Sequence, residues 1–522
     1  MSAVSVAQDL VRTLLAHDVT DAVLAPGSRS GPLALALHAA DQQGLIRLHV
    51  RVDEREAGFL ALGLAKASRR SVPVVTTSGT AVANLHPAML EALHAGVPVL
   101  AVTADRPGRL RGTGANQTTE QRKIFPGVPF TADPRGVSFG GPAHLNLELD
   151  EPLIEPVEWD FTIERSGTAF GFTDQVDTEY LAAAPPTVVV AGDDASQWAR
   201  RAAEDGSWPL LAEPTSGSRT GGNALVSYRL LLNHSRLAEQ IERVVSFGHT
   251  TLSRPVMQLL SRTDIEIIHV GDQTTFPVPA GDNIRFVDVE HVGVETVTDP
   301  MWLTAWLEAD KVATAAIDGV LDGTTPYDVA RIVNQAVTPE GLLFVGSSNP
   351  IRDLDLVARP YPVGERRLIL GNRGLAGIDG VLSSAIGAAL ARESSRALAY
   401  VGDLTFLHGS NGLLIGPNEP RPDMTIVVAS DDGGSIFSTL EQGAPEYAEA
   451  FERVYATPTG ADIGGLCAGY GIPHRTVAAQ DLAAALDEQV TGIRVLEVPV
   501  DRLGRQALVG AIDSAVRAAL QP

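Results

Sequence analysis

Two acidic residues in the last third of the chain could together hold a metal ion. Asp403 comes just after the apolar segment 396–401, and Asp431 comes 28 positions later, just after the apolar segment 424–429. Both segments have the pattern of buried strands, so their carboxyl ends are expected at one edge of a sheet. Mg²⁺ prefers hard oxygen ligands and leaves room for phosphate oxygens when it is held by few carboxylates. Asp403, Asp431 and the main-chain carbonyl of Gly433 are therefore predicted to hold a metal ion with a diphosphate.

The residues around these carboxylates resemble the binding motif of thiamine diphosphate (ThDP) enzymes. The dipeptide Gly402-Asp403 is by itself an ordinary turn, so the prediction depends on the whole constellation. The chain departs from the usual motif at Leu404, where glycine is common, and at Asp431, where asparagine is common. The resemblance implies ThDP and Mg²⁺ (or Mn²⁺) as cofactors, with cofactor contacts from Gly402, Asp403, Leu404, Thr405, Asp431, Gly433, Gly434, Ile436, Phe437 and Leu440.

A carboxylic acid near the N-terminus is the second expected part of such a site. ThDP needs an acid beside N1′ of its aminopyrimidine ring, and that acid must be buried enough for its pKa to rise toward neutrality. Residues 46–52 alternate like a strand, Glu54 follows them, and an apolar helix is expected at 57–67. Glu54 is therefore the predicted catalytic acid. The alternative is a carboxylate that only stabilises the helix N-terminus.

The bulk composition limits the classes of partner. The chain has 522 residues and a net charge of −23, with 40 basic and 63 acidic residues. That length predicts about three domains. The negative net charge disfavours nucleic-acid binding, which calls for a basic surface. An anionic substrate would need a local cluster of arginines. The single cysteine, Cys467, is interpreted as a packing residue in a reducing compartment. We find no signal peptide or membrane span in the sequence and expect a cytoplasmic protein.

The order of apolar strands and helices predicts an α/β protein with three doubly wound parallel-sheet domains. The predicted division is a pyrimidine-binding domain at 1–150, a linker at 151–184, a central domain at 185–324 and a diphosphate-binding domain at 325–522. Two similar outer domains around a third resemble the decarboxylase-like ThDP-binding fold. We find no phosphate-binding loop in the central segment.

Several further segments resemble the SEPHCHC synthase family, whose full name is 2-succinyl-5-enolpyruvyl-6-hydroxy-3-cyclohexene-1-carboxylate synthase. They are APGSRS at 25–30, DER at 53–55, TSGTAVAN at 77–84, TADRP at 103–107, GTGANQ at 112–117 and GNRGLAGIDG at 371–380. The resemblance implies decarboxylation of 2-oxoglutarate and a Stetter-like 1,4-addition of the succinyl semialdehyde unit to isochorismate, in menaquinone biosynthesis. It also implies a homodimer or homotetramer whose active sites are shared between subunits.

The same resemblance implies roles for individual residues. Both substrates carry carboxylates, and guanidinium groups bind carboxylates in a planar, bidentate way. The group holding the 2-oxoglutarate-derived part would be Ser348, Arg352 and Arg373, and the group receiving isochorismate would be Ser28, Arg29, Arg106, Asn116, Gln117 and Arg254. Gln117 would also take part in catalysis, and Ile378 would support the bent form of ThDP. Ser253 stands where a basic residue is expected in this family.

Other interpretations of these residues stay open. Arg106 and Arg352 could be ordinary loop arginines, and Asn116 and Gln117 could merely cap a loop. Another ThDP-dependent 2-oxoacid decarboxylase, or an acetolactate synthase-like carboligase, would share the acid and the metal motif without needing the arginines. A non-catalytic Rossmann-like nucleotide-binding protein is an alternative from a different class.

Overall fold

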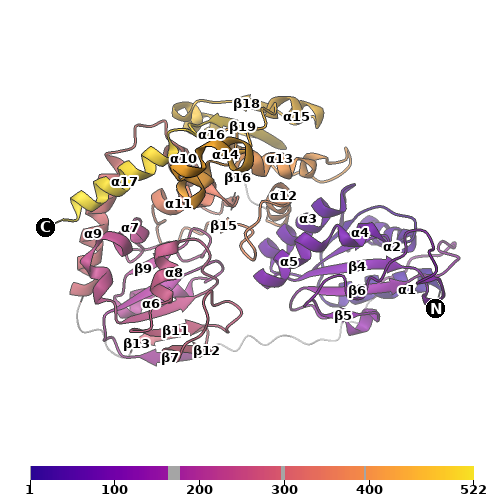
Figure 1. Ribbon diagram of the computed structural model, residues 1–522. Coiled ribbons are helices and arrows are strands. Elements are labelled where there is room, and N and C mark those ends of the chain that lie inside the picture. The colour runs from indigo at the N-terminus through magenta and orange to yellow at the C-terminus, as the bar shows by residue number, and fades with distance from the viewer. Residues whose placement is uncertain (1, 163–176, 295–299, 393–395, 522) are drawn as a thin grey trace.

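The computed structural model describes residues 2–162, 177–294, 300–392 and 396–521. In these residues, three large parallel β-sheets and one two-stranded sheet, connected by helices, form three units that we call the N-terminal, central and C-terminal units (Figure 1). This arrangement confirms the predicted α/β class. The domain boundaries stay a prediction. Within the described residues, every helix is too short or too polar to cross a membrane.

The N-terminal unit is built on six strands in the order β2-β1-β3-β4-β6-β5. These are β1 (Asp21–Leu24), β2 (Arg47–Val50), β3 (Val72–Thr76), β4 (Val99–Asp105), β5 (Phe130–Thr131) and β6 (Ala143–Glu148), with helices α1 (Ala3–Ala16), α2 (Gly31–Gln42), α3 (Glu54–Ser68), α4 (Thr80–Ala83) and α5 (His86–Ala95). Neighbouring residues Val74 and Val75 of β3 belong to different apolar clusters. Because successive side chains of a strand point to opposite faces, this sheet is buried on both faces.

The C-terminal unit repeats the same strand order, here β15-β14-β16-β17-β19-β18. Its strands are β14 (Leu342–Val345), β15 (Leu368–Leu370), β16 (Ala397–Gly402), β17 (Met424–Ser430), β18 (His474–Thr476) and β19 (Ile493–Pro499). Its helices are α10 (Pro326–Ala336), α11 (Asn349–Val357), α12 (Val381–Ala391), α13 (Asp403–His408), α14 (Ala448–Phe451), α15 (Ile463–Gly469), α16 (Leu482–Asp487) and α17 (Arg505–Ala519). The two outer units are therefore similar, as the sequence predicts. Cys467 of α15 is buried, as expected of a packing residue, and burial raises the pKa of its thiol to about 11.

The central unit has five strands in the order β12-β11-β10-β8-β9. They are β8 (Thr187–Ala191), β9 (Leu210–Ala212), β10 (Arg243–Phe247), β11 (Glu266–Val270) and β12 (Ile284–Val287), with helices α6 (Trp198–Gly206), α7 (Tyr228–His234), α8 (Arg254–Leu260) and α9 (Met301–Asp318). A separate parallel pair joins β7 (Thr178–Leu181) to β13 (His291–Val294). The end of the predicted linker is therefore a strand, because β13 supplies its hydrogen-bond partner. Residues 163–176 of that linker lie outside the described residues.

Helices α3 and α12 hold the two outer units together (Figure 1). A Cβ atom on Gly63 would lie 1.9 Å from the main-chain oxygen of Ser384, and one on Gly387 would lie 2.3 Å from that of Leu60. Only glycine allows so close an approach of two helix backbones. Apolar residues of both helices belong to a single cluster that spans the two units. The outer units thus share one core.

Glu56 of α3 is a buried acid in this interface, where the Ser383 hydroxyl donates to its carboxylate at 2.6 Å. Burial raises the pKa of Glu56 to about 7 from an ordinary 4.5. The folded protein therefore binds a proton that the unfolded chain releases, and the free energy of unfolding falls as pH rises from about 4.5 to about 7. A shift of this size corresponds to about 3 kcal/mol.

Glu56→Gln is expected to remove this pH dependence. The variant should melt several degrees above the wild type at pH 8 and together with it at pH 5, because the wild-type carboxyl is already protonated at the lower pH. Melting temperatures of the cofactor-free proteins measure this, with the exposed Glu158 changed to Gln as the control. An equal difference in melting temperature at both pH values would contradict the expectation.

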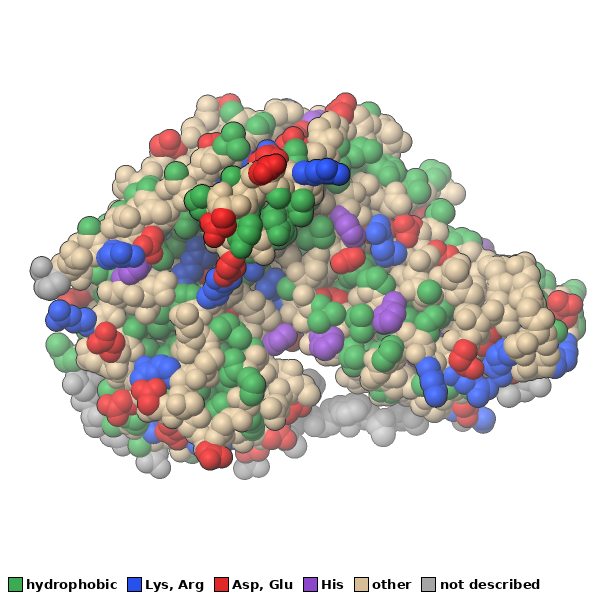
Figure 2. Space-filling view, in the orientation of Figure 1, with side chains coloured by type: hydrophobic (Ala, Val, Ile, Leu, Met, Phe, Trp, Pro, Cys, Tyr) green, Lys and Arg blue, Asp and Glu red, His purple; other side chains and the backbone are tan. Residues whose placement is uncertain are grey.

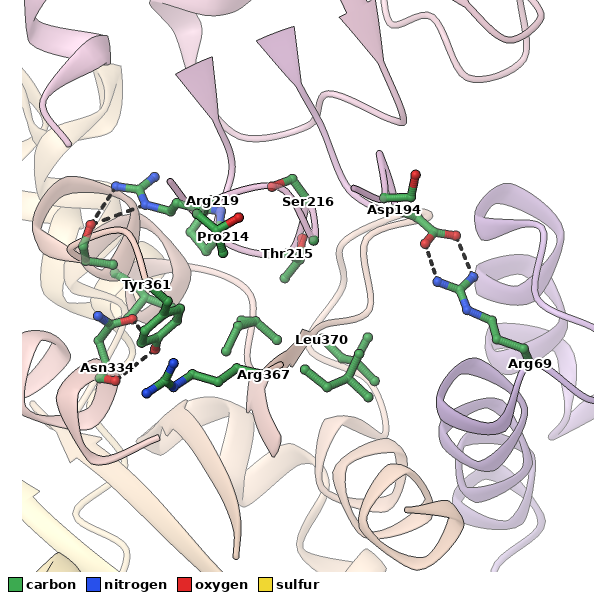
Figure 3. A pocket seen from close by; sticks show the side chains of 17 residues that line it. Arg69, Asp194, Pro214, Thr215, Ser216, Arg219, Asn334, Tyr361, Arg367 and Leu370 are labelled. Carbon is green, nitrogen blue, oxygen red and sulfur yellow. Dashed lines mark hydrogen bonds and ion pairs between the residues drawn. The ribbon is translucent and has the colours of Figure 1, made fainter. Parts of the chain in front are cut away.

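All three units meet beside the C-terminal end of α3. Lys66 donates to the Asp193 carboxylate at 3.0 Å and to the Gly371 carbonyl at 2.6 Å, so one buried ammonium joins the three units. Figure 3 shows the neighbouring ion pair of Arg69 with Asp194, across a small cavity from the stacked side chains of Tyr361 and Arg367. The central unit is thus anchored to both outer units.

Candidate active site

The two predicted metal-binding carboxylates lie side by side at the carboxyl edge of the C-terminal sheet. Strands β16 and β17 are paired so that Gly402 lies opposite Ala429, which places Asp403 and Asp431 at adjacent strand ends. The Asp403 carboxylate accepts from the main-chain N–H of Leu404 at 2.7 Å and of Gly433 at 2.9 Å. Burial, and then the nearby Asp431, raise the pKa of Asp403 to about 7. Burial also raises the pKa of Asp431.

These carboxylates fit a divalent cation. A metal ion would stabilise both acids as carboxylates, since burial raises the pKa of each and Asp431 further raises that of Asp403, and their oxygens are ligands that Mg²⁺ accepts. Apart from its two chain neighbours, no described residue would come within 4 Å of a Cβ atom on Gly402, so space for further ligands lies beside the strand end. The neighbouring Asp432 is exposed and turns away, accepting from the main-chain N–H groups of Thr459 and Gly460.

A cavity of about 150 Å³ opens beside the carboxylates. Of the predicted residues, it is lined by Ser348, Ile378, Gly402, Asp403, Leu404, Thr405, Asp431, Gly433, Gly434, Ile436 and Phe437. A Cβ atom on Gly433 would lie 2.5 Å from the main-chain oxygen of Ala456, so the loop takes this path only with glycine there. The cavity brings together nearly all of the predicted cofactor residues, and Leu440 lies in the adjoining cavity.

The adjoining cavity, of about 380 Å³, collects arginines. Its lining includes Arg229, Arg254, Arg352 and Arg505 together with Ile436 and Leu440. Figure 2 shows Lys and Arg side chains in a hollow between the C-terminal and central units. Burial, and then the nearby Arg373 and Arg229, lower the pKa of Arg352. Arg229 and Arg505 pair with Asp355 and Asp353. A bound anion would therefore stabilise chiefly the charge of the half-buried Arg352.

Arg254 and Arg373 occupy different settings in this region. The Arg254 side chain is 68% exposed and forms an ion pair with Glu441 at 2.8 Å, so it lies at the rim of the second cavity. Arg373 is 2% exposed and lies outside the linings of both cavities, with Thr251 and Ser347 as its hydrogen-bond partners. Ser253 is buried, and no hydrogen-bond partner is seen for its hydroxyl among the described residues.

Sequence reasoning missed some lining residues. Asn349, Asp353 and Arg505 line both cavities, and the guanidinium of Arg505 pairs with the carboxylate of Asp353. Asn349 and Asp353 are four residues apart on α11, and Arg352 lies four residues after Ser348, the N-cap of this helix, so helical spacing could have indicated them. Arg505 follows β19 and has no local signal of this kind.

The predicted isochorismate residues of the N-terminal unit gather at the carboxyl edge of its sheet. Arg106 follows β4 directly and donates to the Asn116 carbonyl at 2.7 Å. Gln117 has a positive φ of 52°, and its carbonyl accepts from the Ser78 hydroxyl at 2.8 Å. Arg29 is buried, donates to the Leu149 carbonyl at 3.0 Å, and has its pKa lowered by burial and then by the nearby Arg106. Ser28 precedes Arg29 in the loop before α2.

Glu54 is the first residue of α3, and Asp53 caps that helix through the main-chain N–H groups of Arg55 and Glu56. Asn84 donates to the Glu54 carboxylate at 3.2 Å. The sequence predicts a buried Glu54, but within one chain its side chain is only half-buried. Glu56, two residues later, is the acid that packing encloses, because it faces α12.

The site residues form two separate groups in one chain. Among the described residues, no hydrogen bond or ion pair joins the predicted site residues of the N-terminal unit to those around the two cavities. Within one chain, Glu54 and the arginines that line the second cavity therefore belong to different groups.

Comparisons with known proteins identify the family of the N-terminal unit and that of the C-terminal unit. Residues 4–124 match the family model described as the thiamine pyrophosphate enzyme N-terminal TPP binding domain, and residues 355–498 match the C-terminal TPP binding domain. The chain is 49% identical over 526 residues to the 2-succinyl-5-enolpyruvyl-6-hydroxy-3-cyclohexene-1-carboxylate synthase of Nocardioides sp., with 97% of each chain covered. It is 42% identical to proteins of that name from Saccharopolyspora erythraea and Kineococcus radiotolerans, with 98% of each chain covered. The chain belongs to the SEPHCHC synthase family.

Membership of the SEPHCHC synthase family confirms the resemblance carried by the sequence motifs. The N-terminal match includes Glu54 and Gln117, and the C-terminal match includes Asp403 and Asp431. The fold is thus that of a ThDP enzyme, and the alternative of a non-catalytic nucleotide-binding protein is not supported. The roles of the individual site residues stay predictions.

Proposed function

We propose that this chain is a SEPHCHC synthase that decarboxylates 2-oxoglutarate and adds its four-carbon unit to isochorismate by 1,4-addition, in menaquinone biosynthesis. The observation that supports substrates with several carboxylates is the group of arginines in the cavity that adjoins Asp403 and Asp431. Burial, and then the nearby Arg373 and Arg229, lower the pKa of Arg352, in a protein whose net charge is −23. Although the protein as a whole is negatively charged, these arginines make this cavity locally positive. Such a cavity is suited to substrates with several carboxylates.

We propose ThDP and Mg²⁺, or Mn²⁺, as the cofactors. Asp403, Asp431 and the Gly433 carbonyl would hold the metal, with diphosphate in the cavity of about 150 Å³. Ile378, Ile436 and Phe437 would provide its apolar walls. When bound, ThDP supplies the nucleophilic carbon and accepts the electrons released by decarboxylation. The protein supplies binding, orientation and electrostatics.

The candidate substrate-binding residues would form two groups, one for each substrate. Ser348, Arg352 and Arg373 would bind the distal carboxylate of 2-oxoglutarate, since Ser348 lines the cofactor cavity and Arg352 the adjoining one. Ser28, Arg29, Arg106, Asn116, Gln117 and Arg254 would bind isochorismate. Glu54 would hold a proton at N1′ of the aminopyrimidine.

We propose a homodimer as the smallest active unit, or a homotetramer built from such dimers. Glu54 and Gln117 of one subunit would then complete the cavity formed by the C-terminal unit of another. The half-buried Glu54 supports this, because a partner surface would enclose its carboxyl group. The single cysteine also supports a reducing compartment, and we propose the cytoplasm.

Isochorismate consumption by the purified protein with 2-oxoglutarate tests the proposal, in reactions with and without ThDP and Mg²⁺. We expect isochorismate to disappear only when all components are present, with one CO₂ released for each molecule consumed. Decarboxylation with isochorismate left intact would instead support another ThDP-dependent 2-oxoacid decarboxylase or carboligase. Absence of both reactions would overturn the proposal.

A further inference from the structure

Arg373 is a buried cation whose direction is set by a residue of the central unit. Its Nε and Nη2 donate to the Thr251 hydroxyl at 3.1 and 2.8 Å, and Nη2 also donates to the Thr251 carbonyl at 3.3 Å. Nη1 donates to the Ser347 hydroxyl at 3.3 Å. Thr251 therefore occupies one edge of the guanidinium. The Nη1 edge faces the turn at Ser347 and Ser348, and Ser348 lines the cofactor cavity.

Thr251 is in turn held by the carboxylate of Glu213, which follows β9. One oxygen of Glu213 accepts from the main-chain N–H groups of Thr251 and Leu252, both at 2.9 Å. The other oxygen accepts from the Thr251 hydroxyl at 3.4 Å. A hydroxyl has one proton and two lone pairs. Since Arg373 uses both lone pairs of the Thr251 oxygen, the proton is left to point at Glu213.

Burial makes this chain of contacts energetically important. Glu213 and Arg373 are each only 2% exposed, and a buried charge is costly unless it is paired or hydrogen-bonded. Burial raises the pKa of Glu213 to about 7, and the charge of Arg373 acts against that rise. The two charges thus stabilise each other across Thr251.

The backbone around Arg373 is fixed from the other side by the N-terminal unit. Glu91 accepts from the main-chain N–H groups of Gly374 and Leu375 at 2.6 and 2.7 Å, and Lys66 donates to the Gly371 carbonyl. Figure 3 shows Pro214, Thr215 and Ser216, the residues after Glu213, in the loop at this three-unit junction. With its backbone held there, the direction of the Arg373 side chain depends on Thr251 at one edge of the guanidinium and on Ser347 at the other.

We propose that Glu213 is a positioning residue, which acts through Thr251 to direct the Nη1 edge of Arg373 toward the distal carboxylate of 2-oxoglutarate. This inference rests on the proposed function of the site. It assigns a role to the central unit, which contributes a buried acid that touches neither substrate nor cofactor. The same acid orients the loop that leads into Arg254 at the start of α8.

The test compares Thr251→Val, which removes the hydroxyl, with Thr251→Ser, which keeps it. Thr251→Val is expected to raise the KM for 2-oxoglutarate about tenfold, since a hydrogen bond to a charged group is lost, with kcat nearly unchanged. Thr251→Ser should stay within about twofold of the wild type. Glu213→Gln should resemble Thr251→Val, because an amide nitrogen in place of the second oxygen cannot accept the Thr251 proton.

Two further measurements separate positioning from a general loss of structure. The KM for 2-oxobutanoate, which lacks the distal carboxylate, should not change in any of these variants, whereas a damaged fold would alter it too. The double variant should be no worse than either single one, because both changes break the same chain of contacts. Additive effects, or equal changes in the two KM values, would overturn the proposal.

Arg373→Ala distinguishes failure of the inference from failure of the proposed function. If its KM for 2-oxoglutarate matches that of the wild type, Arg373 does not bind this substrate and the proposed function of the site is wrong. If Arg373→Ala raises this KM while Thr251→Val and Glu213→Gln leave it unchanged, the site stands and the positioning role is wrong.

Discussion

Glu54→Gln is expected to lower kcat by about 10²- to 10⁴-fold, the usual contribution of a positioned acid or base. The amide keeps the size of the side chain and can still accept from Asn84, but it cannot exchange a proton with N1′ of the aminopyrimidine. Steady-state turnover of 2-oxoglutarate and isochorismate measures the effect. ThDP binding, followed by quenching of protein fluorescence, should persist in the variant.

Glu56→Gln is the matched control for this variant, since the two acids lie two residues apart on α3. Its carboxylate is enclosed between α3 and α12 and bonded to Ser383, so its loss should leave turnover close to that of the wild type. Within a single chain, burial raises the pKa of Glu56 to about 7. Loss of turnover in Glu56→Gln with activity kept in Glu54→Gln would transfer the acid role to Glu56.

Asp403→Asn should weaken the binding of ThDP with Mg²⁺ by at least about 100-fold, because even changes to groups that only support a metal ligand cost about 10- to 100-fold. The wild type, at a ThDP concentration about 100 times Kd, should gain about 2.7 kcal/mol of stability, and the variant only about 0.4 kcal/mol. Melting temperatures with and without ThDP and Mg²⁺ measure the difference. The protein without cofactors should keep its fold, because asparagine can still accept from a main-chain N–H.

Asp432→Asn is the control, because this neighbouring carboxylate is exposed and bonded to Thr459 and Gly460. Its variant should bind ThDP with nearly the wild-type affinity. If Asp432→Asn and Asp403→Asn weakened binding equally, the effect would come from net charge rather than from a metal ligand. The proposed metal site would then be wrong.

Most of the strands could be predicted from apolar runs alone. The runs 72–76, 187–191, 284–287 and 342–345 coincide with strands β3, β8, β12 and β14. Strand β4 differs, because it continues beyond its apolar residues through the polar Thr103 as far as Asp105. Thr103 and Asp105 are buried there and are satisfied by Asn146 on β6. A polar residue can thus extend a buried strand when a partner from elsewhere in the chain bonds to it.

The proximity of the candidate cofactor residues was also largely predictable, because these residues follow two strand ends directly. Asp403 and Asp431 each come just after a strand in the sequence, and parallel strands bring such residues to one edge. The contacts of the candidate substrate residues were harder to predict from the sequence. The sequence motifs indicate Arg373, but its partner Thr251 lies 122 residues away and belongs to another unit.

By itself, the sequence determined the fold class, the cofactor motif and the family, since these depend on residue types and short spacings along the chain. Only the tertiary structure decided which acid of α3 is enclosed, which arginines share a cavity, and what holds Arg373. Burial depends on what packs against a side chain from elsewhere, as α12 packs against Glu56 and as Glu213 holds Thr251. Two residues with the same local pattern, such as Glu54 and Glu56, therefore acquire different environments when the chain folds.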